Sequence, residues 1–132
     1  MLRSIHHIAV ICSDYERSKY FYTQTLGLSV IREVYRETRN SYKLDLSLDG
    51  QYIIELFSFP DPPPRPSRPE SCGLRHLAFA TTDVAAMKRE LESKGVVVEE
   101  IRTDEFTGSR FTFFADPDGL PLEIYEAPAS DH

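Results

Sequence analysis

Two histidines and two glutamates have the residue types and the spacing needed to place four ligands around one metal ion. His7 begins the sequence His-Ile-Ala-Val, and His76 begins His-Leu-Ala-Phe 69 residues later. Glu55 and Glu123 lie in similar apolar stretches and are 68 residues apart. Imidazole nitrogens and carboxylate oxygens suit Zn, Ni, Fe, Co or Mn, without a cysteine ligand. The chemistry to expect is therefore that of one bound divalent metal ion.

These four residues belong to an internal repeat that runs through most of the chain. Each histidine is followed seven residues later by an aspartate, Asp14 or Asp83. A glycine follows each helical stretch, and the turn pairs Asp49-Gly50 and Asp118-Gly119 recur at the same offset. Such self-similarity predicts a duplicated unit that packs against itself. Equivalent residues of the two copies would converge on a local two-fold axis, so one His and one Glu from each copy would form an N2O2 site.

The first copy, residues 5–59, is predicted to be a strand, a helix and three strands. Asp14 or Ser13 would cap the helix, and Gly27 would end it. The Asp49-Gly50 pair predicts a tight hairpin between the last two strands. The expected elements are a strand at Ile5–Cys12, a helix at Tyr15–Leu26, and strands near Ser29–Glu37, Ser41–Leu48 and Gln51–Phe59.

The second copy, residues 73–126, repeats this plan. Its expected elements are a strand at Leu74–Thr81, a helix at Asp83–Lys94, and strands near Val96–Arg102, Arg110–Ala115 and Leu120–Glu126. Residues 60–72 join the copies, and six prolines between Pro60 and Pro69 predict an extended linker. The fold class expected for residues 1–132 is thus one α+β domain, with two βαβββ modules forming a curved mixed sheet and the helices outside.

The alternation of residues along the strands indicates which side chains face the site. Ile54 and Leu56 would face the helix layer, so Glu55 between them points the opposite way. A carboxylate among apolar neighbours is costly unless it is paired or bound to a cation. Alone, a strand histidine or glutamate is more often a core or surface residue, but the matched pairs reverse that reading. His6 would point away from His7 and is assigned no role.

The composition is that of one globular domain and excludes several function classes. Hydrophobic residues make up 41% and charged residues 27% of the 132 positions, and the net charge is −6. No basic stripe is present, which argues against nucleic acid or a membrane as the partner. The chain shows no membrane-spanning stretch and no secretory signal, so a cytoplasmic location is expected. Cys12 and Cys72 are expected to be reduced thiols, with Cys12 buried.

The repeated modules, with His-Ile-Ala-Val at 7–10 and Asp-Pro-Asp-Gly-Leu-Pro-Leu-Glu at 116–123, resemble the vicinal oxygen chelate superfamily. This superfamily includes glyoxalase I, methylmalonyl-CoA epimerase, fosfomycin-resistance thiol transferases and extradiol dioxygenases. All four candidate ligands match the metal positions of glyoxalase I. Further stretches at 33–37, 54–60, 65–70 and 73–76 resemble a bacterial branch of glyoxalase-like proteins.

The resemblance implies a metal-dependent lyase or isomerase of glyoxalase I type. Its substrate would be a small molecule with adjacent oxygens, such as a methylglyoxal–thiol hemithioacetal, and the metal would stabilise an enediolate. Glu123 or Glu55 would be the base, with Glu123 favoured. The alternatives are a fosfomycin-type thiol transferase, which the carboxylate at Glu55 argues against, and a non-catalytic binding protein. A homodimer is implied, with the four ligands from one chain or from two.

Two positions bear on whether the thiol in the substrate is glutathione. Glutathione-dependent relatives carry Arg four residues after the first metal histidine and Asn four residues after the first glutamate. Ile11 and Phe59 stand there, which counts against glutathione. Three arginines could meet an anionic substrate, although a surface role is the first expectation for each: Arg36, Arg39 and Arg110. Four aromatic residues could line a pocket, although core packing is the first expectation for them: Tyr35, Tyr42, Phe106 and Phe111.

Overall fold

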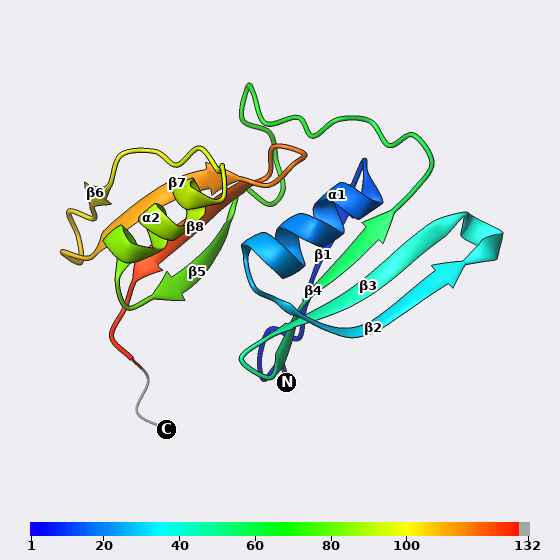
Figure 1. Cartoon of the computed structure of the whole chain (residues 1–132), viewed down its shortest axis with the longest axis horizontal. Helices are drawn as coiled ribbons and strands as arrows, with labels where there is room; N and C mark the ends of the chain where they lie inside the picture. The colour runs from blue at the N-terminus through cyan, green and yellow to red at the C-terminus, as the bar shows by residue number, and fades with distance from the viewer. Residues whose placement is uncertain (130–132) are drawn as a thin grey trace. The chain divides into compact units, whose positions relative to one another are not determined.

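The computed structural model describes residues 1–129 and divides the chain into two compact units, Met1–Pro64 and Arg65–His132. Each unit has its own four-stranded mixed sheet, which confirms the predicted α+β class (Figure 1). The boundary between the units falls inside the predicted linker. The assignment of the two modules to a single domain stays a prediction. Within residues 1–129, no helix combines the length and the apolar character needed to cross a membrane.

The first unit follows the predicted order of a strand, a helix and three strands. Its sheet has the order β1-β4-β3-β2, in which β1 runs parallel to β4 and the other neighbours are antiparallel. The elements are β1 (Ile8–Cys12), α1 (Tyr15–Tyr20), η1 (Phe21–Thr25), β2 (Ser29–Arg36), η2 (Glu37–Arg39), β3 (Ser41–Leu48) and β4 (Gln51–Ser58).

The helical segment of this unit has two parts, where the sequence predicted one helix. It begins after Asp14, whose carboxylate accepts a hydrogen bond from the backbone N–H of Arg17 at 3.2 Å. Beyond Tyr20 the turns widen into a π-helix, in which Leu26 N–H donates to the carbonyl of Phe21 at 2.9 Å. The chain then leaves the helix at Gly27, whose φ of +82° is the left-handed conformation expected of a helix C-cap.

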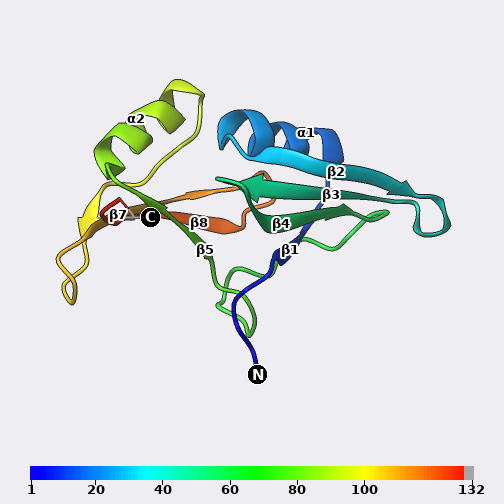
Figure 2. The same cartoon turned by 90° about the horizontal axis from the view of Figure 1, so that it is seen from below.

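The core of the first unit lies between the sheet and its helical segment (Figure 2). Leu44, Leu46, Ile54 and Leu56 are fully buried on the central strands β3 and β4. This confirms that Ile54 and Leu56 face the helix layer, as the alternation predicted. Glu55 between them is only partly buried, so its carboxylate is available on the opposite face of the sheet.

The second unit repeats the arrangement. Its elements are β5 (Leu77–Thr81), α2 (Val84–Ser93), β6 (Arg102–Thr103), β7 (Arg110–Ala115) and β8 (Pro121–Glu126), in the sheet order β5-β8-β7-β6. β5 is parallel to β8, just as β1 is to β4. Asp83 caps α2 by accepting from the N–H of Ala86 at 3.0 Å. Val84 and Leu91 of α2 and Leu122 of β8 are fully buried in the core of this unit.

The strand predicted at Val96–Arg102 is wrong over most of its length, because only Arg102–Thr103 pairs as β6. The preceding residues hold to β7 through single contacts and form no ladder. Glu99 N–H donates to the carbonyl of Phe113 at 3.0 Å, while its own carbonyl accepts from the Thr112 hydroxyl at 2.8 Å and from Lys88 at 3.0 Å. A side-chain donor thus occupies the carbonyl that a regular strand would pair with backbone.

Candidate functional site

The first unit brings His7 and Glu55 together. Glu55 lies in the middle of β4, opposite Ala9 of β1 in the parallel register, and His7 directly precedes β1. The distance from Nε2 of His7 to Oε1 of Glu55 is 3.6 Å. The Glu55 side chain is 16% exposed and the His7 side chain 35%. The carboxylate is therefore partly withdrawn from water while the imidazole stays accessible.

The second unit builds the same pair from His76 and Glu123. Glu123 lies opposite Ala78 in the parallel pairing of β5 with β8, and His76 directly precedes β5. The distance from Nε2 of His76 to Oε1 of Glu123 is 3.3 Å. In both units the predicted strand began too early, since the histidine precedes its first paired residue. The registers still place the two pairs at equivalent positions.

The separation within the second pair, 3.3 Å, fits two ligands of one metal ion, and the separation within the first pair, 3.6 Å, is slightly longer. Ligand atoms about 2.1 Å from an ion, at angles of about 90–109°, are about 3.0–3.4 Å apart. The structure brings the four predicted ligands together as two pairs. Within residues 1–129 it forms no group of three or more metal-binding side chains. The union of the two pairs around one ion stays a prediction.

Glu55 is held on its second oxygen by two donors. The ammonium of Lys43 lies 3.3 Å from Oε2, and the Tyr52 hydroxyl donates to the same atom at 3.3 Å. The Tyr52 ring also stacks on the imidazole of His7, with centroids 5.1 Å apart and an interplanar angle of 18°. Tyr52 therefore contacts both residues of the first pair, and Oε1 of Glu55 is the oxygen left toward His7.

Asp45 accepts hydrogen bonds from both of these donors. Its side chain is fully buried on β3, directly opposite Glu55 in the register. The carboxylate accepts from Lys43 at 2.7 Å, from Tyr52 at 2.7 Å and from Arg32 at 3.0 Å. Burial alone would raise the pKa of this carboxyl, but the hydrogen bonds from Lys43, Tyr52 and Arg32 outweigh it and lower the pKa. Asp45 is thus an anion that fixes Lys43 and Tyr52 in place.

The protonation state of Tyr52 suits its role as a donor. Burial raises the pKa of its hydroxyl, and the neighbouring Asp45 and Glu55 carboxylates raise it further. The hydroxyl therefore keeps its proton at neutral pH and donates to both acids. We call Lys43, Asp45 and Tyr52 the Asp45 network. Sequence reasoning missed it, although Lys43 and Asp45 lie two residues apart on a correctly predicted strand.

His6 does not point away from His7, so that prediction is wrong. The Nδ1 atoms of the two rings are 2.8 Å apart, and the His6 ring also lies edge-on to Tyr52 at 5.3 Å. The alternation of a strand does not apply here because β1 begins only at Ile8. His6 therefore belongs to the surroundings of the first pair.

Glu123 has quite different surroundings. Phe113 of β7 takes the register position that Asp45 holds in the first unit, and the imidazole of His76 lies edge-on to its ring at 5.1 Å. Phe111 stands where Lys43 stands in the first unit. Within residues 1–129, Oε2 of Glu123 has neither a hydrogen bond nor an ion pair. This carboxylate has an unoccupied oxygen, which Glu55 lacks.

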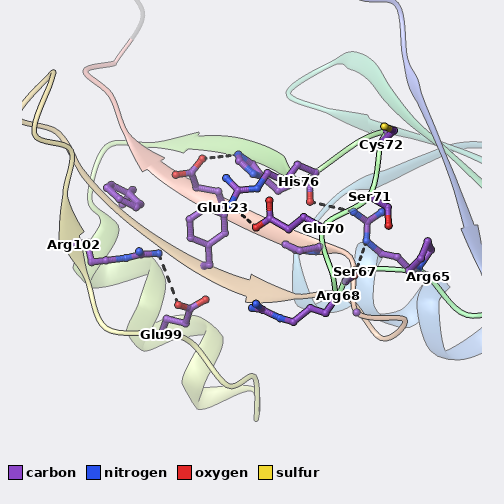
Figure 3. Close-up of a pocket in the computed structure, with 17 residues that line it drawn as sticks. Arg65, Ser67, Arg68, Glu70, Ser71, Cys72, His76, Glu99, Arg102 and Glu123 are labelled. Atoms are coloured by element: carbon purple, nitrogen blue, oxygen red, sulfur yellow. Dashed lines mark hydrogen bonds and ion pairs between the residues drawn. The ribbon is translucent and has the colours of Figure 1, made fainter.

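A cavity of about 910 Å³ opens beside the second pair, entirely within the second unit (Figure 3). Its walls combine the end of the predicted linker with the sheet residues around His76 and Glu123. Phe111 and Phe113 form the apolar part, and Arg102 of β6 lies over both rings at 5.1 and 5.6 Å. The lining thus combines aromatic rings with many charged and polar side chains, and a cavity of this size can hold a small-molecule ligand.

Comparison with known proteins supplies the family. The family model of the Glyoxalase/Bleomycin resistance protein/Dioxygenase superfamily matches residues 4–124. The chain belongs to this superfamily. It is 65% identical to the YwkD protein of Bacillus subtilis strain 168 over 96% of this chain and 98% of that protein. It is 62% identical to the YaeR protein of Escherichia coli K12 over 95% of this chain and 97% of that protein.

Solved and more distant relatives agree with this superfamily. The crystal structure of a glyoxalase family protein from Enterococcus faecalis is 46% identical, with a TM-score of 0.88, and covers 94% of this chain and 98% of its own. Distant relatives include "Glyoxylase I 4" of Arabidopsis thaliana, 27% identical over 93% of this chain and 70% of that protein. The "Glutathione transferase FosA" of Serratia marcescens is 28% identical over 95% of this chain and 82% of that protein. The superfamily thus includes named enzymes.

The other residues singled out from the sequence have varied surroundings. Phe111 lines the cavity, while Phe106 lies outside it and is 89% exposed, so core packing is wrong for Phe106. Arg110 pairs with Glu126 at 3.0 Å, also outside the cavity. Cys12 is buried, as predicted. In the first unit, Tyr35 and Tyr42 contact each other but are also exposed, so core packing is wrong for them too. Arg36 and Arg39 lie over phenylalanine rings.

Sequence reasoning did not predict the contribution of the linker and Arg102 to the cavity. The signal available for the linker was the pair of stretches at 65–70 and 73–76, which already resembled a branch of glyoxalase-like proteins. Its proline content predicted only a spacer, because proline composition describes stiffness and says nothing of what the intervening arginines contact.

Proposed function

We propose that this protein is a divalent-metal-dependent lyase or isomerase of glyoxalase I type. Its substrate is a small molecule with oxygens on adjacent carbons, such as the hemithioacetal of methylglyoxal and a thiol. One observation carries the proposal: each module holds a His–Glu pair at equivalent registers, with Nε2 and Oε1 separated by 3.6 Å or 3.3 Å. Membership of a superfamily that includes enzymes supports it.

The metal would be held by His7, Glu55, His76 and Glu123. Two imidazoles and two carboxylates suit Ni or Zn first, with Co, Mn or Fe compatible. When bound, the ion supplies a Lewis acid that stabilises negative charge on the adjacent oxygens of the substrate. The surroundings of Glu55 support its assignment as a fixed ligand, because Lys43 and Tyr52 engage Oε2 and leave Oε1 for coordination.

Glu123 is the proposed base. A base must reach a substrate carbon, accept its proton and return it to the neighbouring carbon. Glu123 faces the cavity, and its Oε2 is free of donors within residues 1–129. Glu55 would have to break its contacts with Lys43 and Tyr52 to do the same. The difference in donors therefore favours Glu123 over Glu55.

We further propose that the protein is a homodimer in the cytoplasm. One experiment tests whether the two His–Glu pairs of a metal site come from one chain or from two subunits. His7→Ala and His76→Ala chains are purified separately, each expected to lack bound metal, then unfolded together and refolded as a mixture. If each site joins pairs from two subunits, the mixed dimer regains one intact site. If each site forms within one chain, the mixture stays metal-free. Metal content of the isolated mixed dimer gives the answer.

An activity screen tests the proposed function. The protein is loaded with Ni, Zn, Co or Mn and offered methylglyoxal adducts of glutathione and of other cellular thiols. We expect turnover to the lactoyl thioester with at least one metal, and no requirement for glutathione, given Ile11 and Phe59. Fosfomycin with a thiol is the comparison reaction. Turnover of fosfomycin alone, or tight ligand binding without turnover under any metal, would contradict the proposal.

A further inference from the structure

Arg65 holds the end of the linker in place as one wall of the cavity. The guanidinium of Arg65 donates to the carbonyl of Leu74 at 2.5 Å and to that of Arg75 at 3.2 Å, and its Nε donates to the Ser67 hydroxyl at 2.9 Å. A second arginine, Arg75, pairs with Glu70 at 2.9 Å. Both guanidinium groups therefore have structural roles, which fold residues 65–75 beside the sheet.

Two further arginines reach the cavity without such partners. Within residues 1–129, Arg68 makes no hydrogen bond or ion pair and acts on Glu70 only at longer range. Arg102 has an ion pair with Glu99 at 3.8 Å, which is too long for a hydrogen bond. Figure 3 shows the two side chains entering from different walls, one from the linker and one from β6. Their donors are available to a ligand.

The charges of the lining favour an anion. Four arginines line the cavity against three glutamates, Glu70, Glu99 and Glu123. The last of these is committed to the metal in the proposed function, and Glu70 is neutralised by Arg75. The remaining excess is positive, and a divalent ion at the His76–Glu123 end would increase it. A planar guanidinium binds carboxylate or phosphate through two parallel hydrogen bonds.

The ring of Phe113 limits the distance that a ligand must span between His76 and Arg102. The ring of Phe113 contacts His76 at 5.1 Å and also carries the guanidinium of Arg102 at 5.6 Å. Because both groups contact this one ring, the His76 imidazole and the Arg102 guanidinium lie at most about 11 Å apart, a span that a small molecule can bridge. The ring contact also orients the guanidinium, so less conformational freedom is lost when it binds.

We propose that Arg68 and Arg102 bind a carboxylate or phosphate group of the substrate, a few bonds from the adjacent oxygens that meet the metal. This inference rests on the proposed function and narrows its substrate class to small acidic molecules. Arg102, whose guanidinium lies over the rings of Phe111 and Phe113, makes the main contact with the anion. Arg68 of the linker makes the second contact.

Matched probes test the proposal by calorimetry on the nickel- or zinc-loaded protein. Dihydroxyacetone is the neutral probe, dihydroxyacetone phosphate adds a phosphate, and 5-hydroxy-4-oxopentanoate places a carboxylate near the same hydroxyketone. We expect at least one charged probe to bind about tenfold or more tightly than dihydroxyacetone. A preference for one of the two charged probes identifies the anion. Equal affinity for all three, or no binding of any, would overturn the proposal.

Variants locate the anion site. Arg102→Met is expected to remove the advantage of the charged probe, about tenfold, and Arg68→Met to reduce it, with neither altering affinity for dihydroxyacetone. Arg110→Met is the matched control, because Arg110 is exposed, paired with Glu126 and outside the cavity. Circular dichroism and thermal melting check that each variant folds. A charged-probe advantage that survives in both Arg102→Met and Arg68→Met would contradict the assignment.

A titration without metal separates this inference from the proposed function. Inorganic phosphate is added to the metal-free protein, and amide shifts of Arg102 and Phe113 are followed by NMR. We expect saturable shifts that disappear in Arg102→Met and weaken as salt is added. If no metal binds but these shifts occur, the proposed function fails and the anion site stands. If metal binds and phosphate produces no saturable shift at Arg102, the anion site fails alone.

Discussion

The two modules place the same His–Glu pair in different surroundings. Glu55 is flanked by a lysine, a tyrosine and a fully buried aspartate, which hold its second oxygen. At the equivalent registers, Glu123 has Phe111 and Phe113. The sheets share strand order and pairing, so the difference lies in the side chains of one neighbouring strand, β3 in the first unit and β7 in the second.

In the proposed function, this difference gives the two halves of the repeat different roles. The repeated backbone keeps both pairs in register, which is what a shared metal requires. Different side chains on the neighbouring strand then give the two carboxylates different surroundings. Lys43 and Tyr52 hold one carboxylate, while within residues 1–129 the other has one oxygen without a donor, beside a cavity whose walls include aromatic rings. In the proposed function, both pairs hold the metal, the Glu55 side is the fixed one, and proton transfer belongs to Glu123.

The largest expected effect comes from replacing Glu123, the proposed base. Glu123→Gln should lower kcat by about 100- to 10,000-fold, because the amide keeps an oxygen ligand but cannot accept a proton. Glu55→Gln should instead weaken metal affinity more than it lowers kcat of the metal-saturated enzyme. Steady-state kinetics at saturating metal measure both. Retained activity in Glu123→Gln, with Glu55→Gln inactive at full metal occupancy, would reverse the assignment.

Asp45→Asn tests the buried member of the first half. The loss of a buried charge that accepts from three side chains should lower the free energy of unfolding by about 2 kcal/mol. Urea unfolding measures this loss. Asp49→Asn is the control, since Asp49 is exposed in a turn with φ of +50°, a conformation that asparagine tolerates. Equal stability of the two variants would show that the Asp45 network contributes nothing to folding.

The same residue predicts a pH dependence. Because the folded pKa of Asp45 is lowered, its contribution is complete above the pKa of the unfolded chain, about 3.9, and is lost as pH falls through the folded pKa. Below about pH 4, the wild type should therefore lose unfolding free energy more steeply than Asp45→Asn. Thermal unfolding between pH 2 and pH 7 compares the slopes, and parallel curves would contradict the lowered pKa.

Much of this site follows from the spacing of residues in the sequence. The repeat at an offset of 68 to 69 led to His7, Glu55, His76 and Glu123, and the alternation in β4 gave the orientation of Glu55. The neighbours of Glu55 depend on register. A plain hairpin at Asp49-Gly50 would pair Asp45 with Ile54, but an irregularity between Leu46 and Ser47 moves Asp45 opposite Glu55. No local pattern in the sequence predicts this shift in register.

The surroundings of His6 and the cavity wall show a second limit of sequence reasoning. Alternation placed His6 away from His7 because the strand was expected to begin at Ile5, three residues before β1 does. The linker was expected to be a spacer, yet Arg65 folds it back through backbone carbonyls near His76. Contacts between a side chain and distant carbonyls have no periodic signature.

The smallest effects test the donors around each pair separately. Tyr52→Phe keeps the ring that stacks on His7 but removes the hydroxyl that donates to Asp45 and Glu55, and should weaken metal binding about tenfold. Phe113→Leu, at the position equivalent to Asp45, removes no donor and should change metal affinity by less than about threefold. Competition with a metal-binding dye measures both. Equal losses would mean that the two halves hold the metal alike.

The most direct test of the account is the metal content of the purified protein at neutral pH. Elemental analysis after loading should find one divalent ion per chain, whether the four ligands come from one chain or from two. That ion should be lost in both His7→Ala and His76→Ala, each of which keeps the other pair intact. A protein that binds no stoichiometric metal would contradict the central claim, and so would full retention of metal in either variant.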